Sequence, residues 1–365
     1  MRILLCGGGT EGHIAPSLGL AQEMMKVKDE FLFVGRSGGE ENKKIQQMNF
    51  PLCTIAVGSP SSYAWWKKYA IAFDLYRAIK ECGKIIESFR PDAVFSTGGY
   101  VSFAPVMAAA KRKIPIFLHE SNAIFGNATK MLLKHSRMLF LGMPQCEGYI
   151  PSNIVTKYVG TPVRREFYEL TKQSARKKLG LKNEFMILSF GGSLGAQKLN
   201  DACMQIMKNY SSKEGMVHIH STGKRYYASI AEVYPEFANK AGKCRAVSFI
   251  DNMHEYLAAA DLVICRSGAA TISELCAIGA YPIFVPSPNV KNNHQYHNAT
   301  AVAKVASIPV LTENSTLVDS IISEIKFARL HPRDCDEKRN SLRRLSVPNC
   351  SAAILNYIRE ALYSK

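Results

Sequence analysis

The sequence has no long apolar run, since none approaches the roughly 20 residues that a helix needs to cross a bilayer. It also lacks the start of a secretory signal peptide, because Met1–Cys6 leads directly into glycines, as the first strand of a domain would. The ten cysteines include no Cys-x-x-Cys pair and no cluster with histidine at zinc spacing. These absences predict a cytoplasmic protein with reduced thiols.

Acidic residues are also few, 30 against 46 basic ones, which gives a formal net charge of +16. The basic excess is shared: residues 1–160 hold 19 basic and 12 acidic residues, and residues 161–365 hold 27 and 18. A charge of this size favours a negatively charged partner, such as nucleic acid, an anionic membrane surface or a phosphorylated substrate. Nucleic acid is disfavoured, because there is no recognisable binding module and no basic stripe with interleaved aromatics.

At 365 residues, 47% of them hydrophobic, the chain is long enough for two domains with separate cores. Short apolar runs alternate with helical patterns. In the first half we predict strands at residues 2–6, 31–34, 54–57, 93–96, 116–119 and 138–141, with helices at 14–26, 69–88 and 103–111. After a pause near residues 160–162, the second half predicts strands at 185–190, 217–220, 246–249, 262–265 and 281–285.

Continuous apolar strands separated by helices are typical of a parallel sheet that is covered on both faces. The fold class is therefore α/β, with two doubly wound, Rossmann-like domains that face a central cleft. We place these domains at residues 1–162 and 163–340. Residues 341–365 form a C-terminal segment whose amphipathic helix, 352–362, is expected to pack back toward the first domain.

Glycine-rich turns follow strands in both predicted domains. Gly7–His13 and Ser96–Ser102 follow strands of the first domain, and Gly191–Ala196 follows the strand at 185–190. In doubly wound folds ligands bind at the carboxyl ends of the strands, where helix N-termini present unpaired amide groups that suit anions. The turns therefore predict an anionic ligand, and those of the first domain are expected to leave room for a bulky group.

The most informative stretch is Ile264–Glu274, where a buried strand runs through Arg-Ser-Gly-Ala-Ala into a helix predicted at 271–278. Arg266 carries a planar, permanently charged fork that suits phosphate. Glu274 can accept hydrogen bonds from sugar hydroxyls. Together they indicate a nucleotide or nucleotide-sugar site. The alternative is an ordinary turn in which Arg266 and Glu274 pair with each other.

A dinucleotide-binding enzyme is a second possibility, because Gly7-x-Gly9-x-x-Gly12 matches the glycine fingerprint of such proteins. That fingerprint also requires an acidic residue about 20 positions on, for the ribose. The second strand here ends in Val34-Gly35-Arg36, so only an NADP enzyme with Arg36 on the 2′-phosphate is compatible. This hypothesis leaves the turn at 191–196 and the Ile264–Glu274 stretch unexplained.

Polar side chains near the predicted strand ends are the remaining candidates for the site. His13 could act as a general base at neutral pH, or it could only bind phosphate or cap the turn. Asn122 could point into the cleft, while His119 and Glu120 are interpreted as partners of loop backbone. Gln295, in an amide-rich helix start, could bond sugar hydroxyls, although asparagine is common at helix starts in any case.

Two other motifs concern metal and membrane. Asp334-Cys335-Asp336 is the only Asp-x-Asp, and beside Pro332 it is interpreted as a helix N-cap, so no metal is predicted. Both tryptophans lie together in Trp65-Trp66-Lys67-Lys68, a combination that suits an anionic membrane surface and to which Lys111–Lys113 could add. The alternative is a helix with buried tryptophans and a solvated lysine pair.

Taken together, these motifs resemble the MurG family of bacterial peptidoglycan glycosyltransferases, in order and over nearly the whole chain. The matching segments are Gly8–His13, Gly98–Val101, His119–Asn122, Gly160–Arg164, Gly191–Ala196, Phe249–Met253, Arg266–Glu274 and Gln295–Ala299. The resemblance departs from the family pattern at four positions, where Glu11 replaces glycine and Ser121, Leu194 and His294 each replace glutamine.

The resemblance implies an enzyme of GT-B fold that needs no metal and no cofactor. Such an enzyme moves N-acetylglucosamine (GlcNAc) with inversion from UDP-GlcNAc to the 4-hydroxyl of N-acetylmuramic acid (MurNAc) in lipid I, undecaprenyl-pyrophosphoryl-MurNAc-pentapeptide, and forms lipid II. It would lie peripherally on the cytoplasmic face of the bacterial inner membrane. Its partners would be UDP-GlcNAc, lipid I and the anionic membrane surface, with other cell-wall synthesis and division proteins as further candidates. Nucleic acid is not expected as a partner. The nearest rivals are another glycolipid transferase and a UDP-GlcNAc epimerase of the same fold.

The resemblance also implies roles for individual residues. The backbone of Ile250 would contact the uracil, and Glu274 would bind the ribose. Ser193 and Arg266 would bind the phosphates, and Gln295 would bind the sugar hydroxyls. His13 would be the general base, with Arg266 and Glu274 also assigned to the catalytic set. The other residues of the implied substrate site are Thr10, Glu11, Gly12, Asn122, Arg164, Ala269, Ala270, Thr271, Ile272 and Ser273, and the implied membrane contacts are Trp65, Trp66, Lys67 and Lys68.

Overall fold

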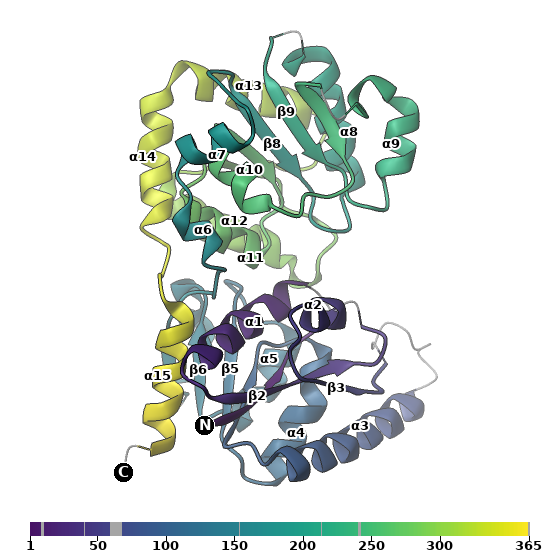
Figure 1. Cartoon of the computed structure of the whole chain (residues 1–365), viewed down its shortest axis with the longest axis vertical. Coiled ribbons are helices and arrows are strands. Elements are labelled where there is room, and N and C mark those ends of the chain that lie inside the picture. Colours follow the sequence, from purple (N-terminus) through teal and green to yellow (C-terminus); the bar gives the residue numbers. More distant parts are fainter. Residues whose placement is uncertain are drawn as a thin grey trace. The chain divides into compact units, whose positions relative to one another are not determined.

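The computed structural model of the chain describes residues 1–8, 11–39, 41–58, 68–152, 154–212, 214–239 and 242–363 (Figure 1). The chain divides into two compact units. The first unit comprises Met1–Val163 together with Val347–Lys365, and the second comprises Arg164–Ser346. The boundary near the C-terminus therefore falls after residue 346 rather than after residue 340, because α14 (Pro332–Arg343) belongs to the second unit.

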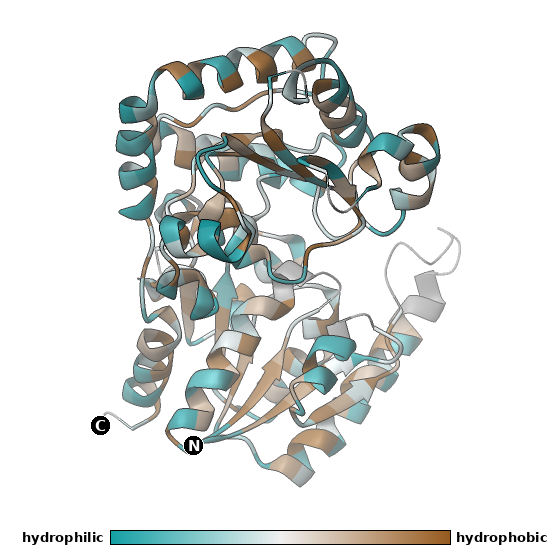
Figure 2. Ribbon diagram, turned by 45° about the horizontal axis from the view of Figure 1, so that its top comes forward, coloured by the Kyte–Doolittle hydropathy of each residue, from teal (hydrophilic) through white to brown (hydrophobic). Residues whose placement is uncertain are grey.

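The first unit is built on a seven-stranded sheet of order β3-β2-β1-β4-β5-β6-β7, in which all pairings are parallel. The four strands at residues 2–6, 93–96, 116–120 and 138–141 are buried along nearly their whole length, which is why they read as mainly apolar runs in the sequence. Figure 2 shows these strands in the brown of hydrophobic residues. The strands are β1 (Arg2–Cys6), β2 (Glu30–Arg36), β3 (Leu52–Ile55), β4 (Ala93–Ser96), β5 (Ile116–Glu120), β6 (Met138–Leu141) and β7 (Thr156–Tyr158).

Side chains that alternate along β1 enter two separate cores. Ile3 and Leu5 pack in the core that includes residues of α1 and α15, whereas Leu4 and Cys6 pack in the core that includes residues of α3 and α4. The C-terminal helix is also held by Asp29, which pairs with the Met1 amino group at 2.9 Å and with Arg359 at 2.6 Å. The helices of this unit are α1 (Glu11–Lys26), α2 (Glu41–Gln47), α3 (Lys68–Phe89), α4 (Phe103–Lys111), α5 (Asn127–Leu132) and α15 (Cys350–Tyr363).

The second unit has a five-stranded parallel sheet of order β10-β9-β8-β11-β12. Its strands are β8 (Met186–Phe190), β9 (Val217–Ser221), β10 (Cys244–Val247), β11 (Leu262–Cys265) and β12 (Pro282–Phe284). Its helices, besides α14, are α6 (Glu166–Glu169), α7 (Lys172–Lys178), α8 (Gln197–Ile206), α9 (Tyr227–Val233), α10 (Met253–Ala259), α11 (Ala269–Ile278), α12 (His294–Ala306) and α13 (Leu317–Leu330). A π-helical turn, Met207–Ser211, prolongs α8.

Both sheets confirm the predicted α/β class with two doubly wound parallel-sheet units, and the differences are local. The strands predicted at 54–57 and 246–249 each begin two residues earlier, as β3 and β10. The sequence gives no apolar signal for β7, because this short strand has no fully buried residue. No helix within the described ranges is long and apolar enough to span a membrane.

All ten cysteines lie in the described part of the chain and are free thiols, as predicted. Cys6 and Cys265 are completely buried at strand ends, in agreement with their interpretation as small core residues. Burial raises the pKa of the Cys6 thiol to about 12, and it raises the pKa of Cys265 as well. Neither thiol is therefore a nucleophile at neutral pH.

Candidate functional site

The site in the second unit lies where the order of the strands reverses, between β8 and β11. Phe190 and Cys265, the last residues of these strands, are direct partners in the sheet. Neighbouring strands run about 4.8 Å apart, so the turns at 191–196 and 266–268 begin side by side. In doubly wound sheets this reversal is the point where ligands bind. The structure thus brings together the turns at 191–196 and 266–268, which are 70 residues apart in the sequence.

The turn at 191–196 is shaped by glycines that no other residue could replace without strain. Gly192 and Gly195 have φ of 93° and 78°, in the left-handed region. A Cβ on Gly195 would also collide with the carbonyl oxygen of Thr222, in the turn after β9. The chain then enters α8 with Ala196 as its N-cap. Since alanine has no side-chain acceptor, the first amide groups of α8 are open to an anion.

The turn after β11 holds Arg266 firmly, and only 9% of this residue is exposed. Its Nη1 donates to the carbonyl oxygen of Val285 at 2.8 Å, and its Nη2 donates to the carboxylate of Glu313. From the sequence, Glu274 was the alternative carboxylate partner of Arg266, and Glu313 was not predicted. Nothing in the pattern marks Glu313, because it lies 47 residues away in a loop and meets Arg266 only through the fold.

The helix after this turn, α11, begins at Ala269, two residues before the predicted start, with Gly268 as its N-cap. The five residues that the resemblance assigned to the substrate site, 269–273, therefore form the first turns of α11. Glu274 follows on the same helix and is half-buried. Ile250 is buried ahead of α10, and α10 packs against α11. Six of the predicted substrate-site residues, 269–274, thus lie on α11, and Ile250 precedes the helix that packs against it.

Gln295 is joined to the Arg266 turn by hydrogen bonds. Ser267 Oγ donates to the carbonyl oxygen of Gln295 at 2.8 Å. The side-chain Oε1 of Gln295 accepts from the backbone N–H of Ser287 at 2.9 Å. Asn292 and Asn293 both have left-handed backbone conformations, with φ of 55° and 50°, so the amide-rich stretch forms the turn that opens α12.

The glycine turns of the first unit pack against each other. Gly98 and Gly99 have φ of 83° and 79°, and a Cβ on Gly99 would collide with the carbonyl oxygen of Gly8. Gly99 is therefore needed for the close approach of two backbones. The expectation that the glycines of this turn leave room for a bulky ligand was wrong for Gly99, whose missing side chain makes room for Gly8.

Asn122 is positioned by Glu120, which is only 3% exposed. The Glu120 carboxylate accepts from Asn122 N and Nδ2 at 3.1 and 2.8 Å, from Gly126 N at 3.0 Å and from Thr129 Oγ1 at 2.7 Å. His119 Nε2 lies 2.8 Å from the carbonyl oxygen of Gly160, and burial lowers the pKa of this histidine. The interpretation of His119 and Glu120 as partners of loop backbone is confirmed.

Several predicted residues fall outside what the structure describes. Thr10, Trp65, Trp66 and Lys67 lie outside the described residues. For Glu11, Gly12, His13 and Lys68 only the backbone is described, and it places the first three in the first turn of α1 and Lys68 at the start of α3. Arg164 is the first residue of the second unit, exposed, with its guanidinium carbon 5.2 Å from the centre of the Phe167 ring.

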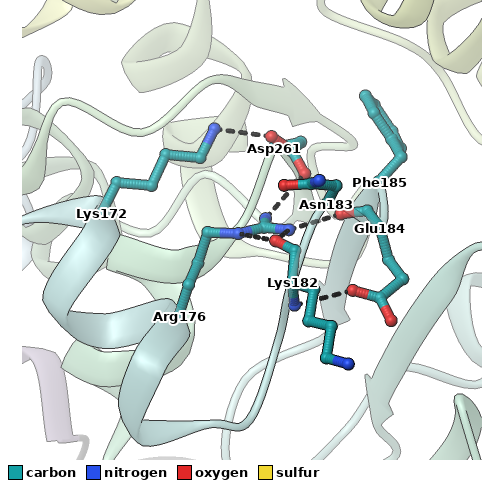
Figure 3. Close-up of a pocket in the computed structure, with 7 residues that line it drawn as sticks. All are labelled: Lys172, Arg176, Lys182, Asn183, Glu184, Phe185 and Asp261. Carbon is teal, nitrogen blue, oxygen red and sulfur yellow. Dashed lines mark hydrogen bonds and ion pairs between the residues drawn. The ribbon is translucent and has the colours of Figure 1, made fainter.

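A pocket in the second unit lies at the opposite end of the strands. Asp261, just ahead of β11, receives the Lys172 ammonium at 2.6 Å and the Arg176 guanidinium at 3.1 Å (Figure 3). Arg176 also donates to the carbonyl oxygens of Lys182 and Glu184. This cluster therefore anchors α7 to the sheet, away from the glycine turns. Its lining residues are Lys172, Arg176, Lys182, Asn183, Glu184, Phe185 and Asp261.

The Asp-x-Asp motif lies in the first turns of α14, whose N-cap is His331 and not one of the aspartates. Asp336 pairs with Arg339 at 2.5 Å, and Asp334 lies 3.8 Å from His331 Nδ1. The interpretation of the Asp-x-Asp motif as the N-cap was wrong: Pro332 takes the first helical position, so the cap falls at His331, ahead of both aspartates. Within the described ranges no group of three or more His, Cys, Asp or Glu side chains is arranged to hold a metal ion.

Comparison with known families decides between the candidate classes. Residues 3–139 match the N-terminal domain of glycosyltransferase family 28, and residues 186–349 match its C-terminal domain. The chain belongs to glycosyltransferase family 28. The C-terminal match covers all five strands of the second sheet and includes the paired turns at 191–196 and 266–268, whereas the N-terminal match ends within β6, ahead of β7.

Curated relatives in this family match over nearly their whole length. A protein of Acetivibrio thermocellus is 32% identical, with 100% of this chain and 99% of the relative covered, and one of Geobacter sp. strain M21 is 33% identical, with 97% and 95% covered. Both are named UDP-N-acetylglucosamine–N-acetylmuramyl-(pentapeptide) pyrophosphoryl-undecaprenol N-acetylglucosamine transferase.

Solved structures show the same GT-B architecture. MurG of Acinetobacter baumannii superposes with a TM-score of 0.75 at 22% identity, covering 98% of this chain and 99% of that one. A UDP-GlcNAc 2-epimerase of Neisseria meningitidis bound to UDP-GlcNAc gives a TM-score of 0.68 at 14% identity, with 99% and 100% covered. Because transferases and epimerases share this fold, the fold alone does not separate them.

Proposed function

We propose that this family 28 protein transfers GlcNAc from UDP-GlcNAc to the MurNAc 4-hydroxyl of lipid I and forms lipid II for peptidoglycan synthesis. The observation that carries the proposal is the pair of turns at 191–196 and 266–268, which begin at partnered strand ends in a chain whose relatives are named as this transferase. The turns bring two helix N-termini to one place, an arrangement suited to a diphosphate.

In the proposed donor site, Ser193 and the first amides of α8 bind the diphosphate, and Glu274 accepts from the ribose hydroxyls. The backbone of Ile250 meets the uracil. Gln295 serves the sugar: its Oε1 already accepts from Ser287, so its two amide N–H groups are the ones offered to sugar hydroxyls. Each of these contacts uses a polar group of the type that its part of UDP-GlcNAc requires.

The proposed reaction is a single displacement at the anomeric carbon. The acceptor oxygen forms the new bond to the sugar while the bond to UDP breaks on the opposite face, which inverts the configuration. The acceptor proton passes to a base, for which His13 is the candidate. The negative charge that develops on UDP is stabilised by the start of α8 and by Arg266.

Titration calorimetry tests the donor half of this proposal. We expect UDP and UDP-GlcNAc to bind the full-length protein without added metal, whereas NADPH should give no heat of binding. A Glu274→Ala variant should bind UDP about tenfold more weakly and should bind 2′,3′-dideoxy-UDP as the unchanged protein does, because the lost contact is to the ribose hydroxyls. Tight NADPH binding together with no UDP binding would favour the oxidoreductase hypothesis instead.

For the first unit we propose contact with an anionic membrane, on the cytoplasmic face of the inner membrane, where lipid I is presented. Phe73 and Tyr76 on α3 are 61% and 59% exposed, and their spacing puts them on one face of the helix. The Arg77 guanidinium lies 5.9 Å from the centre of the Phe73 ring. Aromatic rings beside basic groups suit the interface between acyl chains and anionic head groups.

Sedimentation with vesicles tests this surface. The unchanged protein should pellet with vesicles containing anionic lipid and stay in solution with purely zwitterionic ones. A Phe73→Ser, Tyr76→Ser variant should bind anionic vesicles several-fold more weakly. Leu330→Ser is the matched control, since Leu330 is 75% exposed but lies on the second unit. Equal loss in both variants would argue against a specific membrane surface on α3.

A further inference from the structure

The interface between α8 and the sheet of the second unit is polar where a core would normally be apolar. Ser189 on β8 and His218 and His220 on β9 point to the same face, because Ser189 is the sheet partner of His220 and His218 lies two residues away. All three are completely buried. Asn200 of α8 and Ser211 at the end of its π-helical turn cover this face, and they are 1% and 0% exposed.

The five side chains form one continuous series of hydrogen bonds. Ser211 Oγ lies 3.0 Å from His218 Nδ1, and His218 Nε2 lies 2.8 Å from Ser189 Oγ. Ser189 Oγ also lies 2.8 Å from His220 Nδ1, and His220 Nε2 lies 3.1 Å from Asn200 Oδ1. Beyond these side chains, Asn200 Nδ2 donates to the carbonyl oxygen of Thr222 at 2.9 Å.

The direction of every bond in the series follows from its last member. A carbonyl oxygen can only accept, so the Asn200 amide must present its NH2 to Thr222 and its oxygen to His220. His220 therefore carries a proton on Nε2, and because burial keeps this imidazole neutral, its Nδ1 accepts from the Ser189 hydroxyl. Ser189 must in turn accept from His218 Nε2–H, and the Ser211 hydroxyl donates to His218 Nδ1. The two neutral histidines are therefore in the same tautomer, with the proton on Nε2.

Burial is consistent with that assignment. Desolvation lowers the pKa of His218 to about 3 and that of His220 to about 4. Both imidazoles therefore stay neutral over the physiological range, and each donor in the series keeps its acceptor. A fully satisfied buried network of this kind fixes the relative position of the elements that it joins more sharply than apolar packing does.

The far end of the series lies against the predicted phosphate turn. The Thr222 carbonyl, which receives Asn200, is the atom that a Cβ on Gly195 would strike. A Cβ on Gly223 would in turn collide with the backbone of Gly195. The turn after β9 therefore supports the turn at 191–196 from behind, and Asn200 ties that support to α8 itself, whose first amides face the ligand edge.

We infer that Asn200 and His220 are positioning residues for the nucleotide diphosphate: they hold the turn at 191–196 and the start of α8 in the geometry that receives the phosphates. The inference rests on the proposed UDP-GlcNAc site. It adds two residues that touch no substrate and act through Thr222 and Gly195. Small displacements of such supports are known to weaken a site strongly, since its donors must lie within about 0.5 Å of their productive places.

The test compares substitutions at the two ends of the series in the full-length protein. Asn200→Asp keeps the acceptor for His220 but removes the N–H that binds Thr222. Ser211→Ala removes only the far end of the series, next to His218. We expect Asn200→Asp to raise the Kd for UDP, measured by calorimetry, at least tenfold, and to raise the KM for UDP-GlcNAc in parallel. Ser211→Ala should leave both within about twofold, although both variants lower the melting temperature.

A second pair of variants covers the case in which Asn200→Asp does not fold. His220→Gln keeps an N–H donor for Asn200, whereas His220→Phe removes it, so glutamine should restore most of the UDP affinity that phenylalanine loses. Equal affinities in the members of each pair would overturn the positioning role and leave UDP binding by the unchanged protein standing. If the unchanged protein binds neither UDP nor UDP-GlcNAc, the proposed function fails and this inference with it.

Discussion

Arg266 donates to the carboxylate of Glu313, a residue 47 positions further along the chain, and both side chains are almost completely buried, 11% and 4% exposed. The charge of the guanidinium is thus already partly balanced before any phosphate arrives. Removing one partner of such a buried pair leaves the other uncompensated, which is strongly destabilising. Glu313 therefore bears directly on how much Arg266 can contribute to the binding of a diphosphate.

The first prediction concerns Glu313→Gln, which keeps the shape of the side chain and removes its charge. If Arg266 acts on the diphosphate, this variant should bind UDP about three- to tenfold more tightly, a gain of about 1 kcal/mol, because the guanidinium charge is no longer balanced. Uridine, which has no phosphate, is the control ligand and should bind as before. Equal weakening for UDP and uridine would mean that the pair is only structural.

Arg266→Ala is the complementary change. A well-placed charge stabiliser contributes about 3 kcal/mol to the transition state, so turnover should fall about a hundredfold. Because this variant also leaves Glu313 buried without its partner, the double variant Arg266→Ala, Glu313→Ala is needed beside it. Restored stability with turnover still low would assign the loss to the chemistry. Near-normal turnover in either variant would remove Arg266 from the catalytic set.

A second prediction concerns the close contact between Gly195 and Thr222. Gly195→Ala places a Cβ against the Thr222 carbonyl and also strains a left-handed backbone. Gly215→Ala is the matched control, since Gly215 has φ of 67° and open space around it. The control should lose only about 1–2 kcal/mol of stability from the backbone conformation. Gly195→Ala should lose more in chemical denaturation and should lose UDP binding, and equal losses would contradict the packing described here.

A third prediction concerns Glu120, whose carboxylate accepts three hydrogen bonds from the loop that carries Asn122 and a fourth from Thr129 of α5. In Glu120→Gln an NH2 group faces donors, so we expect a loss of about 2–3 kcal/mol in the free energy of unfolding and a higher KM for the acceptor. Glu87→Gln is the control, because Glu87 forms an exposed pair with Arg112 worth less than about 1 kcal/mol. A stability loss as small as the control's would mean that the loop does not depend on Glu120.

A fourth prediction concerns the dependence of stability on pH. The pKa values of His218 and His220 are lowered on folding from about 6.5 to about 3 and about 4. Below pH 6.5 the unfolded chain binds protons that the folded chain does not, so stability is fully present above pH 6.5 and falls as the pH drops toward 4. Each histidine contributes up to about 1.4 kcal/mol per pH unit to this fall.

Urea denaturation at pH 7 and pH 5 measures the effect. The difference between the two free energies of unfolding should shrink in His218→Gln, which removes one of the two titrating groups. His297→Gln, at an exposed position of the same unit, should leave the difference unchanged. A difference that is the same in all three proteins would show that the buried histidines do not govern acid stability.

The fold could be predicted from the sequence because its central strands are buried on both faces. Arg2–Cys6, Ala93–Ser96 and Leu262–Cys265 each read as a continuous apolar run, and each is a strand with those bounds. Edge elements could not be predicted equally well. β7 is only half-buried, so its apolar pattern is incomplete. For the same reason, the edge strands β3 and β10 were predicted two residues too far along the chain.

The candidate site could be predicted only where a motif is local. The turns at 191–196 and 266–268 carry their own signals, since glycines and a helix start follow a buried strand. Glu313 and the polar series from Ser211 to Thr222 carry none, because their partners meet only after the sheet has formed. His218 and His220 alternate with apolar residues on a strand, a pattern typical of a half-buried strand with its polar side chains in solvent, so it indicates neither the burial of the imidazoles nor what they bind.

The most direct measurement incubates the full-length protein with UDP-GlcNAc and a lipid I analogue, without added metal, and follows both products. We expect one UDP released for each disaccharide lipid formed, with a β-linked GlcNAc on the 4-hydroxyl of MurNAc, and no reaction when the 4-hydroxyl is blocked. Binding and turnover of UDP-GlcNAc without a lipid product, such as conversion to its 2-epimer, would contradict the transferase assignment.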